Sequence, residues 1–350
     1  MASKNVTLME VAKLAGVSTA TVNRVLKQQG YISQDAREKV LAAVAATNYR
    51  PNVVARGLRT QRSYTIGLML TAITINPFFV GVAHAVEAAA IAAGYHVVIF
   101  NHGGNESYER HGIENFIAQR VDAVLFCTAV SAENLEILAS AGIPAIQIER
   151  SLIPGGHFVR VDNYVGARAA MDHLVALGHE RIAFVGGDPA LYPHDHTRQG
   201  SVEEDRMGAY RDGMRAHGLV PDEHYIRLGM YYDLANDISG AEGRRHTEAL
   251  MALPHPPTAI FATCDILAVG VLQALYAAGK RVPNDISVIG FDDTLAPYLA
   301  PQLTTVAQPV SVLGRRGFDM ALAAIEGREM PDEIVLESSL VIRHSTGPAL

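Results

Sequence analysis

Apolar positions from residue 64 onward alternate between short continuous runs and longer stretches with helical periodicity. The short runs predict strands at 64–71, 95–101, 122–126, 145–148, 181–185, 258–261 and 286–290. Apolar strands that alternate with amphipathic helices form parallel sheets covered on both faces. About 290 residues of this pattern exceed one ordinary sheet. We therefore predict an α/β body, 63–350, with two lobes and a cleft between them.

The first 50 residues follow a different pattern, with three short amphipathic segments. Thr7 and Glu10 have the spacing of a capping box that opens a helix, and Gly16 ends it. Ser18 caps a second helix over 19–26, and Ser33 starts a third. The inward positions are predicted to be Leu8, Val11, Leu14, Ala15, Val22, Val25, Leu26, Val40, Leu41 and Val44. Two short helices joined by a Gly-containing turn indicate a small all-α helix-turn-helix head, 1–50.

Small polar side chains lead the second helix of this head. Its exposed positions are predicted to be Thr19, Ala20, Thr21, Asn23 and Arg24. Small residues there let a helix enter the DNA major groove, and an arginine can donate two hydrogen bonds to a guanine. A helical pair without a DNA function can show the same pattern. The charge of this part of the chain distinguishes a DNA-binding pair from one without that function.

Charge divides the chain sharply. The net charge is −7, yet residues 1–62 hold ten Lys/Arg against three Asp/Glu, and four of the five lysines lie before residue 40. A basic head on an acidic body indicates that the head meets a polyanion while the body does not. A solvated basic face is the simpler alternative, but the helix-turn-helix pattern favours DNA.

The segment 51–62 connects head and body. Pro51 suits a first helical turn, but about eight residues are too few for a helix that is stable alone. Leu58 lies between Arg56 and Arg59, as an apolar wedge between phosphate-binding cations would. We predict a hinge helix that orders against a partner; a plain linker with one stray leucine is the alternative.

Composition narrows the class of protein. The chain is 49% hydrophobic and 19% charged, and its two cysteines, Cys127 and Cys264, lie far apart in apolar runs, which is typical of a reducing compartment. The N-terminus lacks the apolar core of a signal peptide. The apolar run 78–100 contains Glu87 and Gly94, which favour a helix, a stop and a strand over a membrane span. We expect a cytoplasmic protein that does not bind membranes.

Candidate ligand-binding residues follow the predicted strands and lie near the starts of helices. They are Phe78, Phe79, Asp162, Arg206, Tyr231, Tyr232, Asp265 and Asp292. Carboxylates, an arginine and aromatic rings suit a polyhydroxylated ligand, and ligands of such folds bind at the carboxyl ends of the strands. Alternatively, Asp162 and Asp265 cap helices, and the phenylalanines belong to the core.

Catalytic motifs are absent from the sequence. It contains no GxSxG, GxGxxG, Walker-type or HExxH pattern, so we predict no enzyme, no cofactor and no metal. The segment 188–204 holds His194, Asp195 and His196, which favour a polar lid loop over a metal site because a third spaced ligand is not apparent.

Two linked strings resemble one known family. VTLMEVAKLAGVSTATVNRVL followed by NYRPNVVARGL is similar to the head of the lactose-repressor (LacI/GalR-type) family of bacterial transcription regulators. The body resembles the effector-binding core of that family, which is similar to periplasmic sugar-binding proteins. The supporting strings are NPFF, LGHERIAFVGG, RMGAYRDGM, PTAIFATCDILAVGVLQAL, RVPNDISVIGFDD and LTTVAQP.

The resemblance implies roles for individual residues. Phe78, Phe79, Asp162, Arg206, Asp265 and Asp292 match positions that touch effectors in relatives. Leu58 is expected to intercalate at the centre of a palindromic operator, beside the copy from a partner subunit. Asn23, where the family usually has Ser, departs from the pattern, and so does Gly57, which replaces a better helix former. The DNA-contacting set is Thr7, Ser18, Thr19, Ala20, Thr21, Asn23, Arg24, Tyr31, Asn52, Val53, Ala55, Arg56, Leu58 and Arg59.

We thus expect a ligand-responsive repressor of carbohydrate genes that binds double-stranded operator DNA as a homodimer. The N-lobe is expected at about 63–162 and 293–326, and the C-lobe at about 163–292 and 327–350. The effector is expected to be a sugar or a derivative; a nucleobase or a sugar acid is the alternative. A solute-binding protein would need a signal peptide and no basic head, and a DNA-bending protein would leave the cleft unexplained.

Overall fold

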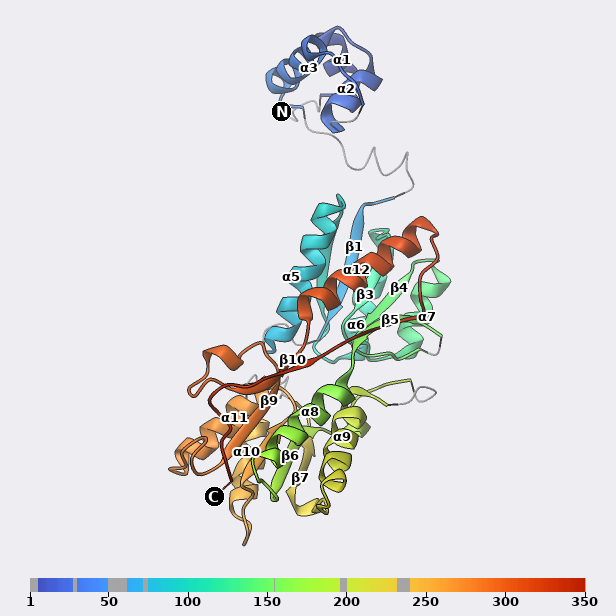
Figure 1. Cartoon of the computed structure of the whole chain (residues 1–350). Helices are drawn as coiled ribbons and strands as arrows, with labels where there is room; N and C mark the ends of the chain where they lie inside the picture. Colours follow the sequence, from blue (N-terminus) through green and yellow to red (C-terminus); the bar gives the residue numbers. More distant parts are fainter. Residues whose placement is uncertain are drawn as a thin grey trace. The chain divides into compact units, whose positions relative to one another are not determined.

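The computed structural model spans the chain and describes residues 6–27, 30–49, 62–71, 75–153, 155–195, 200–231 and 240–349. The chain divides into two compact units, Met1–Ser63 and Tyr64–Leu350, which Figure 1 draws together. We call them the head and the body and describe each by itself. Of the predicted hinge, 51–62, all but the last residue lies outside the described residues.

The head contains the three predicted helices, α1 (Leu8–Ala15), α2 (Thr19–Lys27) and α3 (Gln34–Thr47). The predicted capping box is present: the Thr7 hydroxyl accepts from the Glu10 amide, and the Glu10 carboxylate accepts from the Thr7 amide. Gly16 ends α1 with φ 65°, a left-handed conformation that costs glycine little. The head is therefore a helix-turn-helix unit.

Two of the predicted core positions of the head are wrong. Leu14 is 59% exposed and Leu41 is 51% exposed, while Ala12 and Ala43 are buried beside Val11, Val22 and Val40. Three short helices lie close together when small side chains fill the space between them. Helical periodicity alone does not show whether the leucine or the neighbouring alanine faces inward.

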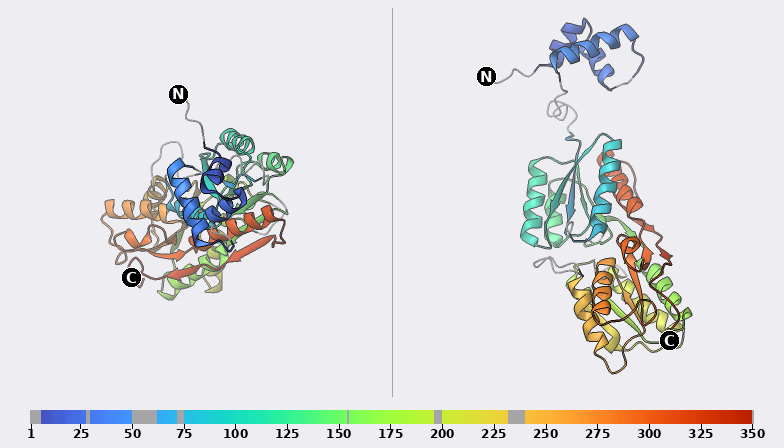
Figure 2. Two further views of the ribbon diagram at one scale, coloured as in Figure 1. Left: turned by 90° about the horizontal axis from the view of Figure 1, so that it is seen from above. Right: turned by 90° about the vertical axis from the view of Figure 1, so that its left-hand side faces the viewer.

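The N-lobe of the body is built on a six-stranded sheet with the order β11-β5-β4-β3-β1-β2 in the described part of the chain. Its strands are β1 (Thr65–Leu70), β2 (His96–Asn101), β3 (Ala123–Phe126), β4 (Ala145–Ile148), β5 (His157–Val161) and β11 (Glu333–Leu336), and all pairs are parallel. Helices α5 (Pro77–Ala92) and α12 (Val310–Glu326) pack together on one face; α6 (Glu106–Ala118) and α7 (Ala132–Ser140) cover the other (Figure 2).

The C-lobe sheet has the order β12-β10-β9-β8-β6-β7 among the described residues. Its strands are β6 (Ile182–Gly187), β7 (Ile226–Gly229), β8 (Ala259–Ala262), β9 (Ser287–Asp292), β10 (Thr304–Ala307) and β12 (Ser339–Val341), the last of these antiparallel. Helices α8 (Asn163–Ala176) and α9 (Val202–Ala216) pack as one pair, and α10 (Ala241–Met251) and α11 (Asp265–Ala277) as another. Short 3₁₀ turns lie at η1 (Pro189–Leu191), η2 (Glu223–Tyr225) and η3 (Ala296–Tyr298).

The predicted lobe boundaries need two corrections. Strand β10 pairs with β9 and therefore belongs to the C-lobe, although 293–326 was expected in the N-lobe. Strand β11 pairs with β5 in the N-lobe, although 327–350 was expected in the C-lobe. Both strands are four residues long, and neither β10, which begins with Thr304 and Thr305, nor the half-buried β11 forms a strong apolar run. For similar reasons, β5, β7 and β12 were not predicted as strands.

The apolar run 78–100 is the predicted helix and strand. Helix α5 ends at Ala92, Gly94 follows with φ 77°, and β2 begins at His96. Over the part of the chain that the structure describes, no helix is both long and apolar enough to cross a bilayer.

Candidate functional site: the head surface and the interlobe cavity

Helix α2 presents the predicted DNA-contacting residues on the head. Thr19, Ala20 and Arg24 are exposed, whereas Thr21 and Asn23 are half-buried. The Ser18 hydroxyl accepts from the Thr21 amide at 3.1 Å and lies 2.9 Å from the Thr21 hydroxyl. Ser18 therefore both begins α2 and orients the Thr21 side chain.

The remaining head residues divide into two groups. Thr7 is exposed at the start of α1, and Tyr31, between α2 and α3, is 96% exposed. The predicted hinge contacts Asn52, Val53, Ala55, Arg56, Leu58 and Arg59 lie outside the described residues.

A cavity of about 220 Å³ lies between the two lobes of the body, where strands of both sheets end. From the N-lobe it is lined by residues that follow β1, β2, β3 and β4, and from the C-lobe by residues at the ends of β7, β8, β9 and β10. We call it the effector cavity. This is the position that the strand-end argument predicted.

Asp292 is the carboxylate at the floor of the effector cavity. Its backbone has φ 116°, which is strained for a residue with a side chain. Its Oδ1 accepts from Gln308 Nε2 at 2.7 Å, while Oδ2 and Gln308 Oε1 are buried without a hydrogen bond to the described residues. Burial raises the pKa of Asp292 to about 8, against the effect of Arg206, and Asp265 raises it further. Two polar atoms are thus held in place for a ligand: Gln308 Oε1 can accept, and Asp292 Oδ2, which can hold the proton at neutral pH, can donate.

Arg206, on α9, lies beside this carboxylate and is fully engaged. Its Nε and Nη2 donate to Asn163 Oδ1 at 2.9 and 2.7 Å, and Nη1 donates to the Thr263 carbonyl at 2.6 Å. Its guanidinium stacks 3.8 Å above the Phe291 ring, and Glu149 Oε1 is 3.9 Å away. The three hydrogen bonds hold Arg206 within the C-lobe, and the ion pair with Glu149 connects it to the N-lobe. Its positive charge is therefore already balanced before a ligand binds.

Phe78 and Phe79 form an aromatic wall at the start of α5. Asn76 caps this helix by accepting from the Phe78 amide at 3.0 Å, and Pro77 is its first residue. The two rings meet edge to face with centroids 5.5 Å apart, and both line the effector cavity although each is nearly buried. They belong to the core and to the cavity wall at once.

Two of the predicted ligand contacts do not line the effector cavity. Asp162 caps α8 by accepting from the Val165 amide at 3.0 Å, as the alternative for this residue proposed. Asp265 is fully buried and accepts from the amides of Thr294, Leu295 and Ala296 and from the Thr305 hydroxyl, so it holds the turn after β9 and does not cap a helix. Its acceptor positions are filled by the chain itself.

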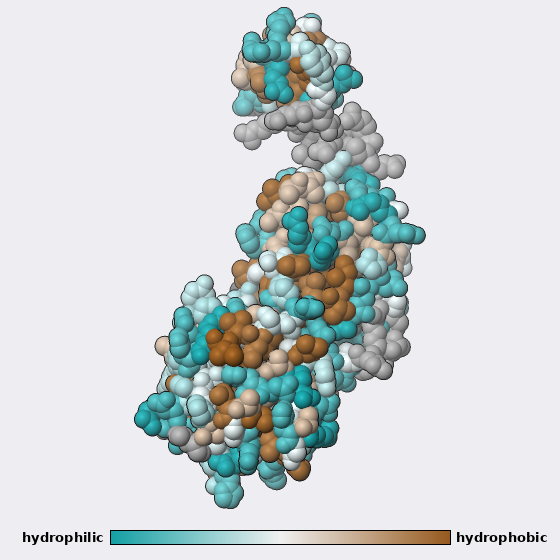
Figure 3. All heavy atoms as spheres, in the orientation of Figure 1, coloured by the Kyte–Doolittle hydropathy of each residue, from teal (hydrophilic) through white to brown (hydrophobic). Residues whose placement is uncertain are grey.

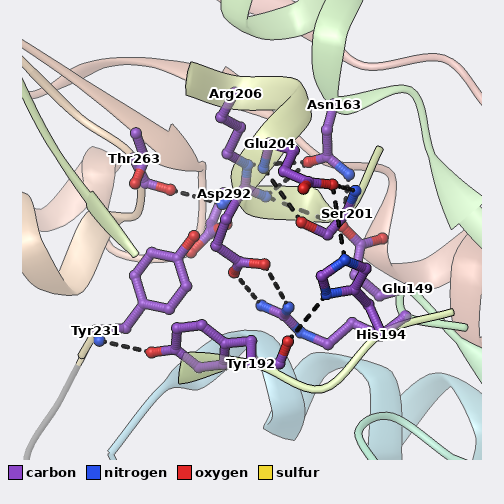
Figure 4. A network of polar contacts seen from close by, with 12 residues as sticks. Glu149, Asn163, Tyr192, His194, Ser201, Glu204, Arg206, Tyr231, Thr263 and Asp292 are labelled. Atoms are coloured by element: carbon purple, nitrogen blue, oxygen red, sulfur yellow. Dashed lines mark hydrogen bonds and ion pairs between the residues drawn. The ribbon is translucent and has the colours of Figure 1, made fainter. Parts of the chain in front are cut away.

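Tyr231 lines the effector cavity, and Tyr232 lies outside the described residues. The Tyr231 amide donates to the Tyr192 hydroxyl at 2.8 Å, and the two rings lie 5.3 Å apart (Figure 4). Tyr192 follows η1 and was not among the predicted residues.

Sequence reasoning also missed Glu149, Arg150, Thr128, His102 and Gln308, all of which line the effector cavity. Glu149 and Arg150 directly follow β4, a predicted strand, so their place in the chain was available as a signal. Gln308 follows β10, which was not predicted. Burial lowers the pKa of His102 to about 4 and raises the pKa of the free thiols Cys127 and Cys264, so none of the three is set up for acid–base or thiolate chemistry near neutral pH.

Residues 194 and 195, which belong to the predicted polar lid loop over 188–204, make hydrogen bonds to backbone carbonyl groups. His194 Nδ1 lies 3.1 Å from the Tyr192 carbonyl, and the Asp195 amide donates to the Ser151 carbonyl at 2.8 Å, which links the lobes. His196 lies outside the described residues, and no cluster of metal-binding side chains occurs within the described ranges.

Comparisons with known proteins agree with this architecture. Residues 7–52 match the model of bacterial regulatory proteins of the lacI family, and 171–346 match a periplasmic binding protein-like domain. The chain is 35% identical over 324 residues to the ribose operon repressor of Escherichia coli K12, covering 91% of this chain and 93% of the relative. It is 34% identical over 350 residues to the transcriptional regulator DegA of Bacillus subtilis, covering 98% of each.

Among solved structures, a lac repressor dimer bound to operator and the anti-inducer ONPF superposes with a TM-score of 0.80 at 30% identity, over 98% of this chain and all of that one. Taken with the helix-turn-helix head and the interlobe cavity, these matches show that the chain belongs to the lacI family of bacterial regulatory proteins: it is a DNA-binding transcription regulator that senses a small effector, and not an enzyme.

Proposed function

We propose that the protein is a repressor that binds a palindromic operator as a homodimer and responds to a neutral, polyhydroxylated, one-ring effector in the effector cavity. The observation that carries the proposal is the set of buried polar atoms that have no partner among the described residues: Asp292 Oδ2, Gln308 Oε1 and Thr128 Oγ1. Gln308 Oε1 accepts, the Thr128 hydroxyl can both accept and donate, and Asp292 Oδ2 donates when the carboxyl group is protonated. Hydroxyl groups of a sugar satisfy such atoms, and the rings of Phe78 and Phe79 cover its apolar face.

A neutral ligand fits better than an anionic one. Both arginines that line the cavity are committed, Arg206 to Asn163 and Thr263 and Arg150 to Glu203. The pKa of Asp292 is raised to about 8, so this group is neutral at pH 7 and gives an acid group no positive partner either. A sugar acid is therefore disfavoured, whereas a nucleobase stays the second candidate because the two phenylalanine rings offer apolar surface to a planar ring.

A dimer supplies the second half of a palindromic site. Apolar side chains are exposed on α5 and α12, namely Val80, Ile91 and Val312, and Figure 3 shows apolar surface over this region. We propose that this face pairs two subunits; a dimer is the state in which the similar lac repressor structure is bound to operator. Effector binding between the lobes would then change the spacing of the two heads and of the hinge residues around Leu58.

The test has two parts. An operator is first selected from a random duplex pool with the purified full chain, and thermal unfolding is then screened with D-ribose, D-glucose, D-galactose, D-glucuronate, adenine and guanine. We expect a palindrome to be enriched and a neutral monosaccharide to raise the Tm and change operator affinity about 5–150-fold, the usual range of allosteric coupling. Enrichment of no palindrome, or a response to a purine alone, would contradict the proposal.

A further inference from the structure

We propose that the ion pair between Arg150 and Glu203 is the selectivity wall of the effector site: it separates the effector cavity from a second interlobe cavity and so restricts the effector to a single neutral ring. The inference rests on the proposed function, because it concerns which ligands the same cleft admits.

The second cavity has about 250 Å³ and lies on the other side of this wall. Three residues, Glu149, Arg150 and Val202, line both cavities. In the view of Figure 4, Tyr192 and Tyr231, which line the effector cavity, lie toward the left, and His194 and Ser201, which line the second cavity, lie toward the right. The two spaces are therefore neighbours that share one wall, in which Arg150 takes part directly, while the buried Glu203, which lines neither cavity, holds Arg150 in place.

The wall joins the two lobes by a two-pronged contact. Arg150, which follows β4 in the N-lobe, donates from Nη1 to Glu203 Oε2 at 2.7 Å and from Nη2 to Glu203 Oε1 at 2.5 Å. Glu203 lies in the first turn of α9 in the C-lobe, and its side chain is fully buried, while that of Arg150 is 15% exposed. The Arg150 guanidinium also stacks 4.8 Å above the Tyr192 ring. Such paired donors and acceptors fix an orientation as well as a charge.

Neighbouring residues pack tightly around the Glu203 side chain. Gly187, at the end of β6, lies so close that a Cβ there would come within 2.8 Å of the Tyr231 ring and 2.9 Å of Glu203 Cγ. Burial alone would raise the pKa of Glu203, yet Arg150 holds it below its usual value, so the carboxylate stays charged and the pair intact at neutral pH. In this arrangement of the lobes, Arg150 and Glu203 are therefore a charged, doubly hydrogen-bonded pair.

Polar groups line the second cavity as they would line a sugar subsite. Glu149, Asp205 and Glu333 line it with carboxylates, Ser201 with a hydroxyl and Arg160 with a guanidinium whose Nε already donates to Glu333. The Asn163 amide also lines it, but its nitrogen already donates to Glu149 and to the Val161 carbonyl. Groups of this chemistry recognise hydroxyls, so a second sugar ring would find partners if the wall were absent. With the wall present, a disaccharide meets Arg150, which the ion pair with Glu203 holds in place.

The experiment measures the binding of D-ribose, D-glucose, D-galactose, cellobiose, lactose and D-glucuronate to the full chain by calorimetry. For the wild type we expect at least one monosaccharide to bind about 100-fold more tightly than either disaccharide. The double variant Arg150→Ala/Glu203→Ala removes the wall, and we expect this ratio to fall at least tenfold. The matched variant Arg150→Met/Glu203→Leu keeps the volume of the wall without its charges, and we expect the ratio to change less than threefold.

A third variant tests the charge of the wall separately from its size. Glu203→Gln keeps the shape of the wall but frees the Arg150 charge, so we expect D-glucuronate to gain at least tenfold relative to the neutral monosaccharides. Equal binding of monosaccharide and disaccharide by the wild type overturns the inference without any variant. It is also overturned if the alanine double variant, folded by circular dichroism, keeps the wild-type ratio.

Failure of the proposed function gives a different result. If the wild type binds none of the monosaccharides, or binds a purine instead, the one-ring sugar effector is wrong and the wall has no sugar to select. If the wild type binds a monosaccharide and the ratio between one ring and two is unaffected by removing the wall, only the inference about Arg150 and Glu203 is wrong.

Discussion

The head and the body place their polar side chains in opposite ways. In the head, the core consists of Val and Ala residues around Val11, Val22 and Val40, and the polar residues of α2 lie at the surface. In the body, Arg206, Glu203 and Asp292 are buried between the lobes and bonded to residues of other elements. The head thus carries its recognition on an outer face, whereas recognition in the body is built into the interior.

This difference has a consequence for mutation. A surface contact on α2 can be removed without disturbing the fold, whereas a buried charge in the body supports the fold and the ligand site together. The predictions below test this contrast in order of decreasing effect.

Arg206→Met is expected to have the largest effect. It removes the positive charge beside the buried Glu149 carboxylate and the two donors to Asn163 Oδ1, while the hydrogen bond between Glu149 and Asn163 remains. Loss of one member of a buried charge network costs about 3–5 kcal/mol. Urea unfolding of the full chain should show this loss in the body transition, together with loss of effector binding. Arg215→Met on the same helix, where Arg215 is exposed and pairs with Asp212, is the control and should change stability by less than about 0.5 kcal/mol.

Val22→Ala should affect the head alone. The Val22 side chain is fully buried, and removing its methyl groups costs about 2–3 kcal/mol when the lost burial and the cavity are combined. Operator binding at 37 °C should fall while effector binding stays at the wild-type level. The control is Leu14→Ala, which removes an exposed leucine of α1 and should be nearly neutral. Loss of effector affinity in Val22→Ala would show that head and body are not separable in this way.

Arg24→Ala tests the recognition surface itself. Arg24 is exposed on α2, and loss of a two-pronged contact to a base costs about 1–3 kcal/mol of discrimination. Fluorescence anisotropy should show weaker binding to the selected operator and a smaller change for random duplex, with an unchanged Tm. Lys39→Ala on α3, where Lys39 pairs with Asp35, removes the same charge and should lower both affinities equally. The same uniform loss in Arg24→Ala would reduce its role to a phosphate contact.

The last prediction concerns the change in the free energy of unfolding per pH unit. The pKa of Asp292 is raised to about 8 in the folded protein, so between about pH 4 and pH 8 the folded state holds a proton that the unfolded state has released. The free energy of unfolding therefore falls as the pH rises through this window, by at most about 1.4 kcal/mol per pH unit from this group. Asp292→Asn should flatten the slope in urea unfolding measured from pH 5 to pH 8, and an unchanged slope would assign it to other groups.

Local signals predicted the head well and the body in part. Capping residues, Gly16 and the charge of the first 62 residues are read directly from neighbouring positions, and they located α1, α2 and α3. Strong apolar runs located the central strands of both sheets, and Asp292 and Arg206, predicted from the sequence as ligand contacts, both line the cavity. Leu14 and Leu41 were placed wrongly because helical periodicity does not show how closely the helices approach.

Patterns among neighbouring residues were enough to predict the helix-turn-helix head, the alternation of strands and helices, and the family to which the chain belongs, because each of these depends on residues near one another in the chain. The tertiary structure decided the course of β10 and β11, the pairing of Gln308 with Asp292, and the contact of Arg150 with Glu203. These partners lie 16 and 53 residues apart along the chain, and no local pattern fixes which distant charge a buried group will meet. Only the packing of two lobes brings them together, because a buried charge must find its partner wherever the fold places one.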